Sequence, residues 1–150
     1  MTLSNVDEIL DYAIAREQDA HDFYMELAKK MDRPGMKQVF TQFAGEELGH
    51  RKKLESVKSG KRLLPSAEKV LDLKIADYTV EVDPDADIDY QKALILAMKR
   101  EKASFRMYSD LAASVTDEDL KLTFFALAHE EAKHKLRFEV EYDEVILVEN

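Results

Sequence analysis

One pattern of charged residues occurs twice in the sequence, in the same order and at the same spacing. Glu17 is followed 30 residues later by Glu47-Leu-Gly-His50. Glu101 is followed 30 residues later by Glu131-Ala-Lys-His134. Any fold of this chain must therefore accommodate two copies of one arrangement, a Glu and a Glu-x-x-His pair.

The repeat extends well beyond these residues. When the second half of the chain is shifted by 84 residues onto the first, many identical residues coincide. The coinciding pairs include Leu10 and Leu94, Arg16 and Arg100, Tyr24 and Tyr108, Phe40 and Phe124, and Glu55 and Glu139. The chain is thus a duplicated unit joined by residues 59–88.

Composition favours helices for that unit. The 150 residues are 45% hydrophobic, enough for one ordinary domain with a core, and we expect a single domain over 1–150. Only 4 Gly and 3 Pro interrupt a sequence rich in Ala, Leu, Glu and Lys. This usage is typical of long helices, so we expect an all-α fold.

Start and stop signals divide each unit into two helices. Asn5 followed by Glu8 resembles a capping box, and Asp32-Arg-Pro34-Gly35 marks a stop and a restart. Ser59-Gly60 favours an end to the second helix. The predicted helices cover about residues 5–31, 35–58, 88–113 and 116–142.

The second unit begins with similar signals. Asp87 or Asp89 is the expected cap of the third helix, and Thr116 with Asp119 three residues later is the expected start of the fourth. The apolar tail Val145–Val148 is expected to pack on the bundle as a strand or a last turn.

The connection over residues 59–88 is too long for a tight turn. It contains a candidate short helix from Ser66 to about Ala76 and an alternating stretch, Tyr78, Val80 and Val82, that favours an extended conformation. Its length is enough to cross the whole bundle, which predicts a four-helix bundle with one long crossover. The duplication adds a pseudo-twofold axis down the middle, with paired residues facing each other.

The doubled charged residues occupy core positions of these helices. The six candidate metal ligands are Glu17, Glu47, His50, Glu101, Glu131 and His134. Ionised groups are rarely buried unless they are paired, and four carboxylates together would repel one another or need protonation. Two divalent cations would cancel four negative charges. We therefore predict a two-metal site.

Carboxylates combined with neutral imidazoles suit iron or manganese better than calcium or structural zinc, and we expect two iron ions, with manganese as the alternative. Tyr24 and Tyr108 share the ligand face, where either a hydrogen bond to a ligand carboxylate or simple core packing explains them. Glu46 and Glu130 each precede a ligand and stand four residues before a histidine; we expect them on a solvated face, with contact to a ligand as the alternative. Under the repeat His21 falls on Phe105 and His129 falls on Gly45, so neither histidine recurs, and we expect structural or surface roles for both.

The remaining composition excludes several classes. A net charge of −9 argues against nucleic acid and anionic membranes as partners. With no cysteine, this chain cannot form a disulfide or a Cys-ligated iron site. The first residues lack a basic and apolar leader pattern, and no apolar run reaches the length of a membrane span. We expect a cytoplasmic protein.

The pattern resembles the rubrerythrin family of ferritin-like di-iron carboxylate proteins over nearly the whole chain. The residues that carry the resemblance are Glu17 with Tyr24, Glu47 with His50, Glu101 with Tyr108, and Glu131 with His134. The resemblance implies that Glu17 and Glu101 are terminal ligands, that Glu47 and Glu131 bridge two irons, and that each histidine caps one iron.

The resemblance also implies an oxidoreductase that reduces hydrogen peroxide or dioxygen, in a homo-oligomer such as a dimer. Peroxide-reducing rubrerythrins typically have another glutamate three residues after the third-helix ligand, where this chain has Ser104. They also usually carry a Cys-rich rubredoxin module, so electrons are expected from an external donor such as a rubredoxin-like protein. The alternatives are an iron-binding ferroxidase for storage or transfer, and a structural bundle with a vestigial site.

Overall fold

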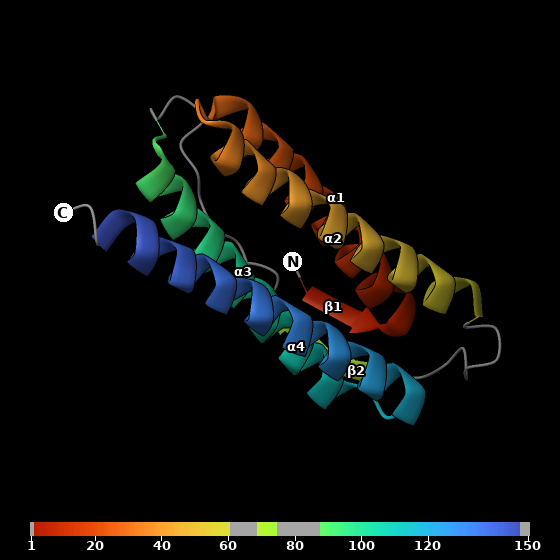
Figure 1. Ribbon diagram of the computed structural model, residues 1–150. Coiled ribbons are helices and arrows are strands. Elements are labelled where there is room, and N and C mark those ends of the chain that lie inside the picture. Colours follow the sequence, from red (N-terminus) through yellow and green to blue (C-terminus); the bar gives the residue numbers. More distant parts are fainter. Residues whose placement is uncertain (1, 61–68, 75–87, 148–150) are drawn as a thin grey trace.

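The computed structural model describes residues 2–60, 69–74 and 88–147, and its main feature is four long helices. Helices α1 (Val6–Lys30) and α2 (Pro34–Gly60) form one hairpin, and α3 (Tyr90–Ser114) and α4 (Glu118–Glu141) form the other. Figure 1 shows these hairpins as two layers. The predicted all-α bundle is confirmed. Within the described ranges, no helix is long and apolar enough to cross a membrane.

Side-chain caps set the starts of α1 and α3. The Asn5 side chain accepts a hydrogen bond from the backbone N–H of Glu8 at 2.9 Å, as the capping-box pattern predicts. The Asp89 carboxylate accepts one from Lys92 at 2.8 Å. Of the two caps predicted for α3, Asp89 is therefore the cap, while Asp87 lies outside the described residues.

The start of α4 differs from the prediction. Thr116 is not the cap, because Asp117 occupies that position and its carboxylate accepts from the backbone N–H of Leu120 at 2.8 Å. A carboxylate at this position also interacts favourably with the helix dipole. The helix consequently begins one residue later than a Thr116 cap would allow.

Two short strands accompany the helices. Strands β1 (Thr2–Asn5) and β2 (Lys69–Lys74) pair antiparallel. The short helix predicted from Ser66 to about Ala76 is therefore wrong for the part that is described. A short isolated helix is only marginally stable, whereas the backbone of β1 offers this segment hydrogen-bond partners. The stretch predicted to be extended at Tyr78, Val80 and Val82 lies outside the described residues.

The chain end packs on the bundle as a last helical segment. A π-helical segment, η3 (Tyr142–Leu147), continues α4, and Tyr142, Val145 and Ile146 pack against the apolar core. This agrees with the prediction of a packed last turn, whereas Val148 lies outside the described residues.

Contacts between the hairpins show how the two repeats are related. Tyr24 of α1 contacts Glu101 of α3, and Tyr108 of α3 contacts Glu17 of α1. Because each contact joins a later residue of one helix to an earlier residue of the other, α1 and α3 run antiparallel. The pseudo-twofold axis therefore lies across the helices, and the predicted facing of paired residues is confirmed. Helix α2 ends and α3 begins at opposite ends of the bundle, as the predicted crossover requires (Figure 1).

The buried apolar residues form two clusters along the bundle. One contains Ile9, Leu54, Tyr108 and Phe124, and the other contains Tyr24, Phe40 and Phe138 together with Leu94. Most of these residues are repeat-related, so the duplication builds both clusters from similar parts. The six predicted ligands belong to neither cluster, which leaves a charged layer within an apolar bundle.

Candidate metal centre

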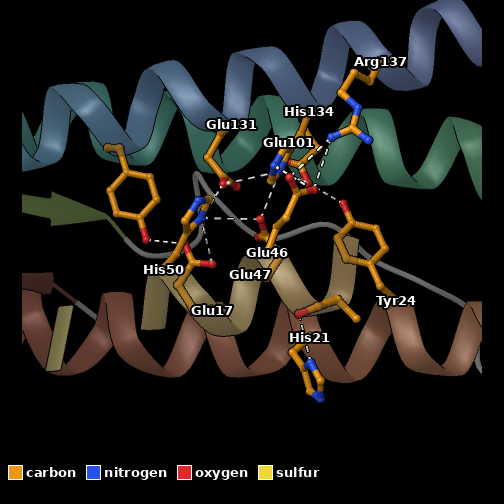
Figure 2. Close-up of polar contacts among 12 residues, drawn as sticks. Glu17, His21, Tyr24, Glu46, Glu47, His50, Glu101, Glu131, His134 and Arg137 are labelled. Carbon is orange, nitrogen blue, oxygen red and sulfur yellow. Dashed lines mark hydrogen bonds and ion pairs between the residues drawn. The ribbon is translucent and has the colours of Figure 1, made fainter. Parts of the chain in front are cut away.

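All four helices contribute to the charged layer, as Figure 2 shows. The buried ionisable residues are Glu17 from α1, Glu47 from α2, Glu101 from α3, and Glu131 and His134 from α4, each exposed by no more than 2%. The side chain of His50, from α2, is 12% exposed. The structure thus brings together all six residues that the sequence pattern singled out.

His50 lies among three carboxylates. Its Nδ1 atom is 3.0 Å from Oε1 of Glu131, 3.5 Å from Oε1 of Glu47 and 3.6 Å from Oε2 of Glu17. The closest of these carboxylates belongs to the opposite hairpin. An imidazole nitrogen and three carboxylate oxygens at such distances are a donor set for one metal ion.

His134 has the matching surroundings from the other repeat. Its Nδ1 atom is 3.1 Å from Oε1 of Glu47, 3.6 Å from Oε1 of Glu101 and 3.8 Å from Oε1 of Glu131. Its ring stacks with that of His50, with centroids 5.6 Å apart and 10° between the planes. The pseudo-twofold relation therefore extends to the residues around each imidazole, although His50 lies near Oε2 of Glu17 and His134 lies near Oε1 of Glu101.

Among the described residues, three groups of potential ligands overlap in this layer, and within each group the donor atoms lie within 4.8 Å of one another. One group joins Glu47 to both histidines, and the other two have four residues each. Of these two, the first is Glu17, Glu47, His50 and Glu131, and the second is Glu47, Glu101, Glu131 and His134. Glu47 and Glu131 belong to both groups, whereas Glu17 and Glu101 belong to one each. Two shared and two unshared carboxylates are the arrangement that bridging and terminal ligands require. Metal binding by these residues stays a prediction.

Several donor atoms in the charged layer are buried without a hydrogen-bond partner, as expected for atoms that bind a cation. Among the described residues, several buried donor atoms have no hydrogen-bond partner: Oε2 of Glu17 and Glu101, Oε1 of Glu47, both carboxylate oxygens of Glu131, and Nδ1 of both histidines. Buried polar atoms without partners are costly, and a metal ion would satisfy all of them at once. The residues present therefore fit a pair of divalent cations.

The electrostatics of the two shared carboxylates support the same conclusion. Burial raises the pKa of Glu47 well above its ordinary value, and the charges of Glu101 and Glu17 raise it further. Burial likewise raises the pKa of Glu131, with Glu101 and Glu47 adding to the effect. Without a cation these carboxyls keep their protons to higher pH than an exposed glutamate does, and a bound metal would displace those protons.

Two tyrosines hold the unshared carboxylates from across the hairpin interface. The Tyr24 hydroxyl donates a hydrogen bond of 2.5 Å to Oε1 of Glu101, and the Tyr108 hydroxyl donates to Oε1 of Glu17. Burial, followed by the charge of the same carboxylate, raises the pKa of each tyrosine well above 10, so both remain donors. Each bond occupies one carboxylate oxygen and leaves Oε2 available for a metal.

The two repeats differ around the outer nitrogen of one histidine. Oε2 of Glu46 lies 3.5 Å from Nε2 of His134, and Arg137 pairs with the same carboxylate at 3.3 Å. The repeat-related Glu130 instead pairs with Lys133 at 3.9 Å on the exposed surface. Both glutamates are partly exposed, Glu46 by 38% and Glu130 by 46%, as predicted, but Glu46 also lies near a histidine of the charged layer. Sequence spacing alone could not separate the two, since both stand four residues before a histidine.

The other two histidines lie outside the charged layer. Nδ1 of His21 is 3.0 Å from the backbone oxygen of Ala44, and His129 is exposed on α4. Neither is part of the ligand groups formed by the described residues. This agrees with their predicted structural and surface roles.

Comparison with known proteins adds the family. Residues 8–142 match the family model of rubrerythrin. The chain belongs to the rubrerythrin family. This rubrerythrin-family chain is also similar to a hypothetical protein from Pyrococcus furiosus, at 26% identity and a TM-score of 0.68, over 93% of this chain and 89% of the other.

A protein from Thermotoga maritima, assigned to the ferritin-like diiron-carboxylate proteins, matches with a TM-score of 0.74. Its sequence is 21% identical, and the match covers 92% of this chain and 93% of the other, so the likeness shows the fold. No curated protein matches the sequence. Family and fold therefore agree with the ligand groups that the structure brings together.

Proposed function

We propose that this chain holds two iron ions in the charged layer and reduces hydrogen peroxide or dioxygen with electrons from an external donor. The observation that carries the proposal is the overlap of two ligand groups at Glu47 and Glu131. A single mononuclear site would not need two carboxylates shared between two histidine-containing groups.

Iron and manganese fit the donors better than calcium or structural zinc. The layer offers carboxylate oxygens and imidazole nitrogens in a chain without cysteine, a mixture that suits iron and also manganese. When bound, a pair of Fe(II) ions supplies two electrons, the number that reduces one hydrogen peroxide to two waters with two protons.

The protein's own residues would have distinct tasks. Glu47 and Glu131 would fix the spacing of the ions, while Tyr24 and Tyr108 orient the terminal carboxylates and keep their protons. The apolar clusters limit access by bulk water. His50 is the most exposed of the six residues, which makes its side of the layer the expected entry for a small oxidant.

Ser104 bears on which oxidant reacts. It lies in α3 one turn after Glu101 and is 9% exposed. A serine there removes the extra carboxylate that resemblance to peroxide-reducing rubrerythrins would lead one to expect. A site without that carboxylate favours the second candidate, a ferroxidase that oxidises Fe(II) for storage or transfer, more than the family alone would.

Anaerobic reconstitution with Fe(II), followed by stopped-flow mixing with peroxide and with dioxygen in separate runs, tests the proposal. We expect two irons per chain, faster oxidation by peroxide than by dioxygen, and re-reduction by a rubredoxin-like donor. Equal rates with the two oxidants would remove the peroxidase assignment and leave an oxidase or ferroxidase.

Variants make the test specific to the layer. Glu47→Ala combined with Glu131→Ala should abolish both two-iron binding and rapid oxidation. A matched control is Glu55→Ala combined with Glu139→Ala, because these glutamates are also repeat-related, lie on the same two helices and are 45% and 41% exposed. If the first variant kept both properties, the site would be assigned to the wrong residues.

A further inference from the structure

Three buried hydrogen-bond donors without a partner lie outside the charged layer. They are the Tyr12 hydroxyl and the Nε atoms of Arg16 and Arg100, and no acceptor among the described residues reaches them. By contrast, Arg51 of α2 and Arg137 of α4 each pair with a glutamate. Buried donors without acceptors are costly, so Arg16 and Arg100 need an acceptor beyond those that the described residues supply.

The three donors lie together at the interface of α1 and α3. One face of α1 carries residues at steps of four, three and four positions, namely Tyr12, Arg16, Asp19 and Phe23. Arg100 of α3 reaches the same face, because its guanidinium carbon lies 4.5 Å from the centre of the Phe23 ring. Two helices that meet across the hairpin interface therefore direct their arginines to one region.

The charges of the two arginines interact with each other and with the phenol. Burial lowers the pKa of Arg100, and the charge of Arg16 lowers it further. Burial raises the pKa of Tyr12, and the charge of Arg16 opposes this rise. Two positive charges that repel each other beside a neutral donor are stabilised when an anion lies among them.

The carboxylates nearby do not fill this position. Asp19 is close enough for its charge to oppose the lowering of the Arg100 pKa, but it is exposed, and Nε of neither arginine bonds to it. Glu17 and Glu101 directly follow the two arginines, and side chains of successive helical residues point about 100° apart. These two glutamates point into the charged layer, so the arginines lie on its flank.

We propose that Tyr12, Arg16 and Arg100 bind a small divalent oxyanion, of which inorganic phosphate is the simplest form. An arginine presents Nε and one terminal nitrogen side by side, a spacing that matches two oxygens of one phosphate. The Phe23 ring covers a face of the Arg100 guanidinium, which leaves the in-plane N–H groups available for such a pair. Two guanidiniums balance the two charges of the ion, and the phenol adds a further donor.

Burial decides the size of the ion. Because both Nε atoms and the Tyr12 oxygen are buried, a free ion reaches them more easily than a phosphate group on a larger molecule. The site also differs from its repeat-related position, since Tyr12 and Asp19 correspond to the apolar residues Leu96 and Ala103 on α3. The duplication therefore leads to one oxyanion site per chain, on the side of the α1 residues.

Calorimetric titration of the full chain with inorganic phosphate tests the site, in chloride at fixed ionic strength and with a chelator present so that metal ions do not contribute. We expect saturable binding of one phosphate per chain. Arg16→Gln and Arg100→Gln should each raise the dissociation constant about tenfold or more, and Tyr12→Phe should raise it less. Asp19→Asn should lower it, because a negative charge beside the ion is removed. Glycerol phosphate should bind more weakly than inorganic phosphate.

Lys29→Gln combined with Lys102→Gln is the matched control, since it removes one positive charge from each of the same two helices. Both lysines are exposed, and they stand thirteen and two residues after Arg16 and Arg100, which places them on the far side of each helix. This variant should bind phosphate as the wild-type chain does, and circular dichroism checks that every variant folds.

Four outcomes would each overturn the proposal. They are a wild-type chain without saturable phosphate binding, an equal loss of affinity in the lysine control, an unchanged dissociation constant in Asp19→Asn, and equal or tighter binding of glycerol phosphate. Because the titration is made without metal, none of these outcomes bears on the two iron ions, which reconstitution with Fe(II) tests separately.

Discussion

The two hairpins are nearly alike inside and different outside. Their inner faces place Glu17 and Glu101, or Tyr24 and Tyr108, in equivalent surroundings with equivalent partners. On the outer faces, α2 is polar where α4 is apolar, as the pair Lys52 and Leu136 illustrates. The inner residues complete one another's donor groups across the interface, so both hairpins must keep them. The outer residues take no part in those groups, so they can differ between the hairpins.

The most severe way to break the internal symmetry is to remove one shared carboxylate. Glu47→Gln should reduce binding from two irons to none or one weakly held iron per chain, because Glu47 belongs to both ligand groups. Glu131→Gln should have the same effect. Glu17→Gln or Glu101→Gln should weaken only one of the two ions. Metal analysis after gel filtration, combined with calorimetric titration, measures the difference.

A result in which Glu47→Gln and Glu17→Gln lose the same single ion would contradict the division into shared and unshared carboxylates. Circular dichroism of each variant would show that the bundle is intact, and Glu55→Gln provides a control on α2 outside the layer.

The metal-free protein should lose stability as pH rises. The pKa values of Glu47 and Glu131 are raised above 4.5 in the folded state, chiefly by burial, so the folded chain binds more protons than the unfolded chain above that pH. Each such proton lowers the free energy of unfolding by about 1.4 kcal/mol per pH unit. The loss begins near pH 4.5 and continues through the raised folded values.

His50 acts in the same direction. Burial lowers its pKa, but the neighbouring Glu17 and Glu47 carboxylates outweigh burial and raise the pKa above 6.5. The stability this histidine contributes is present below pH 6.5 and is lost as pH rises through the raised value. Urea unfolding at several pH values in the presence of a chelator measures both effects. Glu47→Gln with Glu131→Gln should flatten the profile, and an unchanged slope would contradict the carboxylate assignment.

The ligand residues on the inner faces of the hairpins could be predicted from the sequence because the repeat shows them directly. Two copies of Glu and Glu-x-x-His at core positions of helices could converge only if the hairpins faced each other. The pairing of Tyr24 with Glu101 was less accessible, since spacing along one helix does not say which partner an opposite helix supplies. The predicted cap of α4 was wrong for a local reason: Thr116 and Asp117 are neighbours of similar capping propensity, and Asp117 is the residue that caps the helix.

Other features lay beyond a single sequence because they depend on contacts distant along the chain. Strand β2 forms where a short helix was predicted, since residues 2–5 supply its pairing partner. The outer face of α4 is visible in the sequence as Leu122, Phe125, Leu136 and Val140. It could be judged exposed only once the side of α4 that faces the core was known.

Removing one tyrosine hydroxyl should have a smaller effect than removing a shared carboxylate, and it tests whether the two repeat-related tyrosines contribute equally. Tyr24→Phe leaves Oε1 of Glu101 buried without its donor, and Tyr108→Phe does the same to Glu17. Each change should lower the free energy of unfolding of the metal-free protein by about 1–3 kcal/mol. The two losses should be similar, as urea unfolding can show. A negligible loss in both variants would mean that these rings contribute packing alone.

The smallest expected effect lies where the repeats diverge beside the charged layer. Glu46 approaches Nε2 of His134 at 3.5 Å under Arg137, whereas Glu130 pairs with Lys133 on the surface. A carboxylate near the ring nitrogen that does not bind metal favours the tautomer with the proton on that nitrogen, which leaves the second ring nitrogen free to bind the metal. Glu46→Gln should therefore weaken binding of one of the two ions by about tenfold, the lower end for such partners.

Glu130→Gln is the matched control and should leave both affinities unchanged. Competitive titration with a chelating dye resolves a tenfold change in one ion while the other serves as an internal reference. Equal effects of the two substitutions would mean that Glu46 acts only through the general charge of the surface. A loss confined to Glu46→Gln would show that two hairpins with matching sets of three ligands bind their ions unequally, because Glu46 lies 3.5 Å from Nε2 of His134 whereas Glu130 pairs with Lys133.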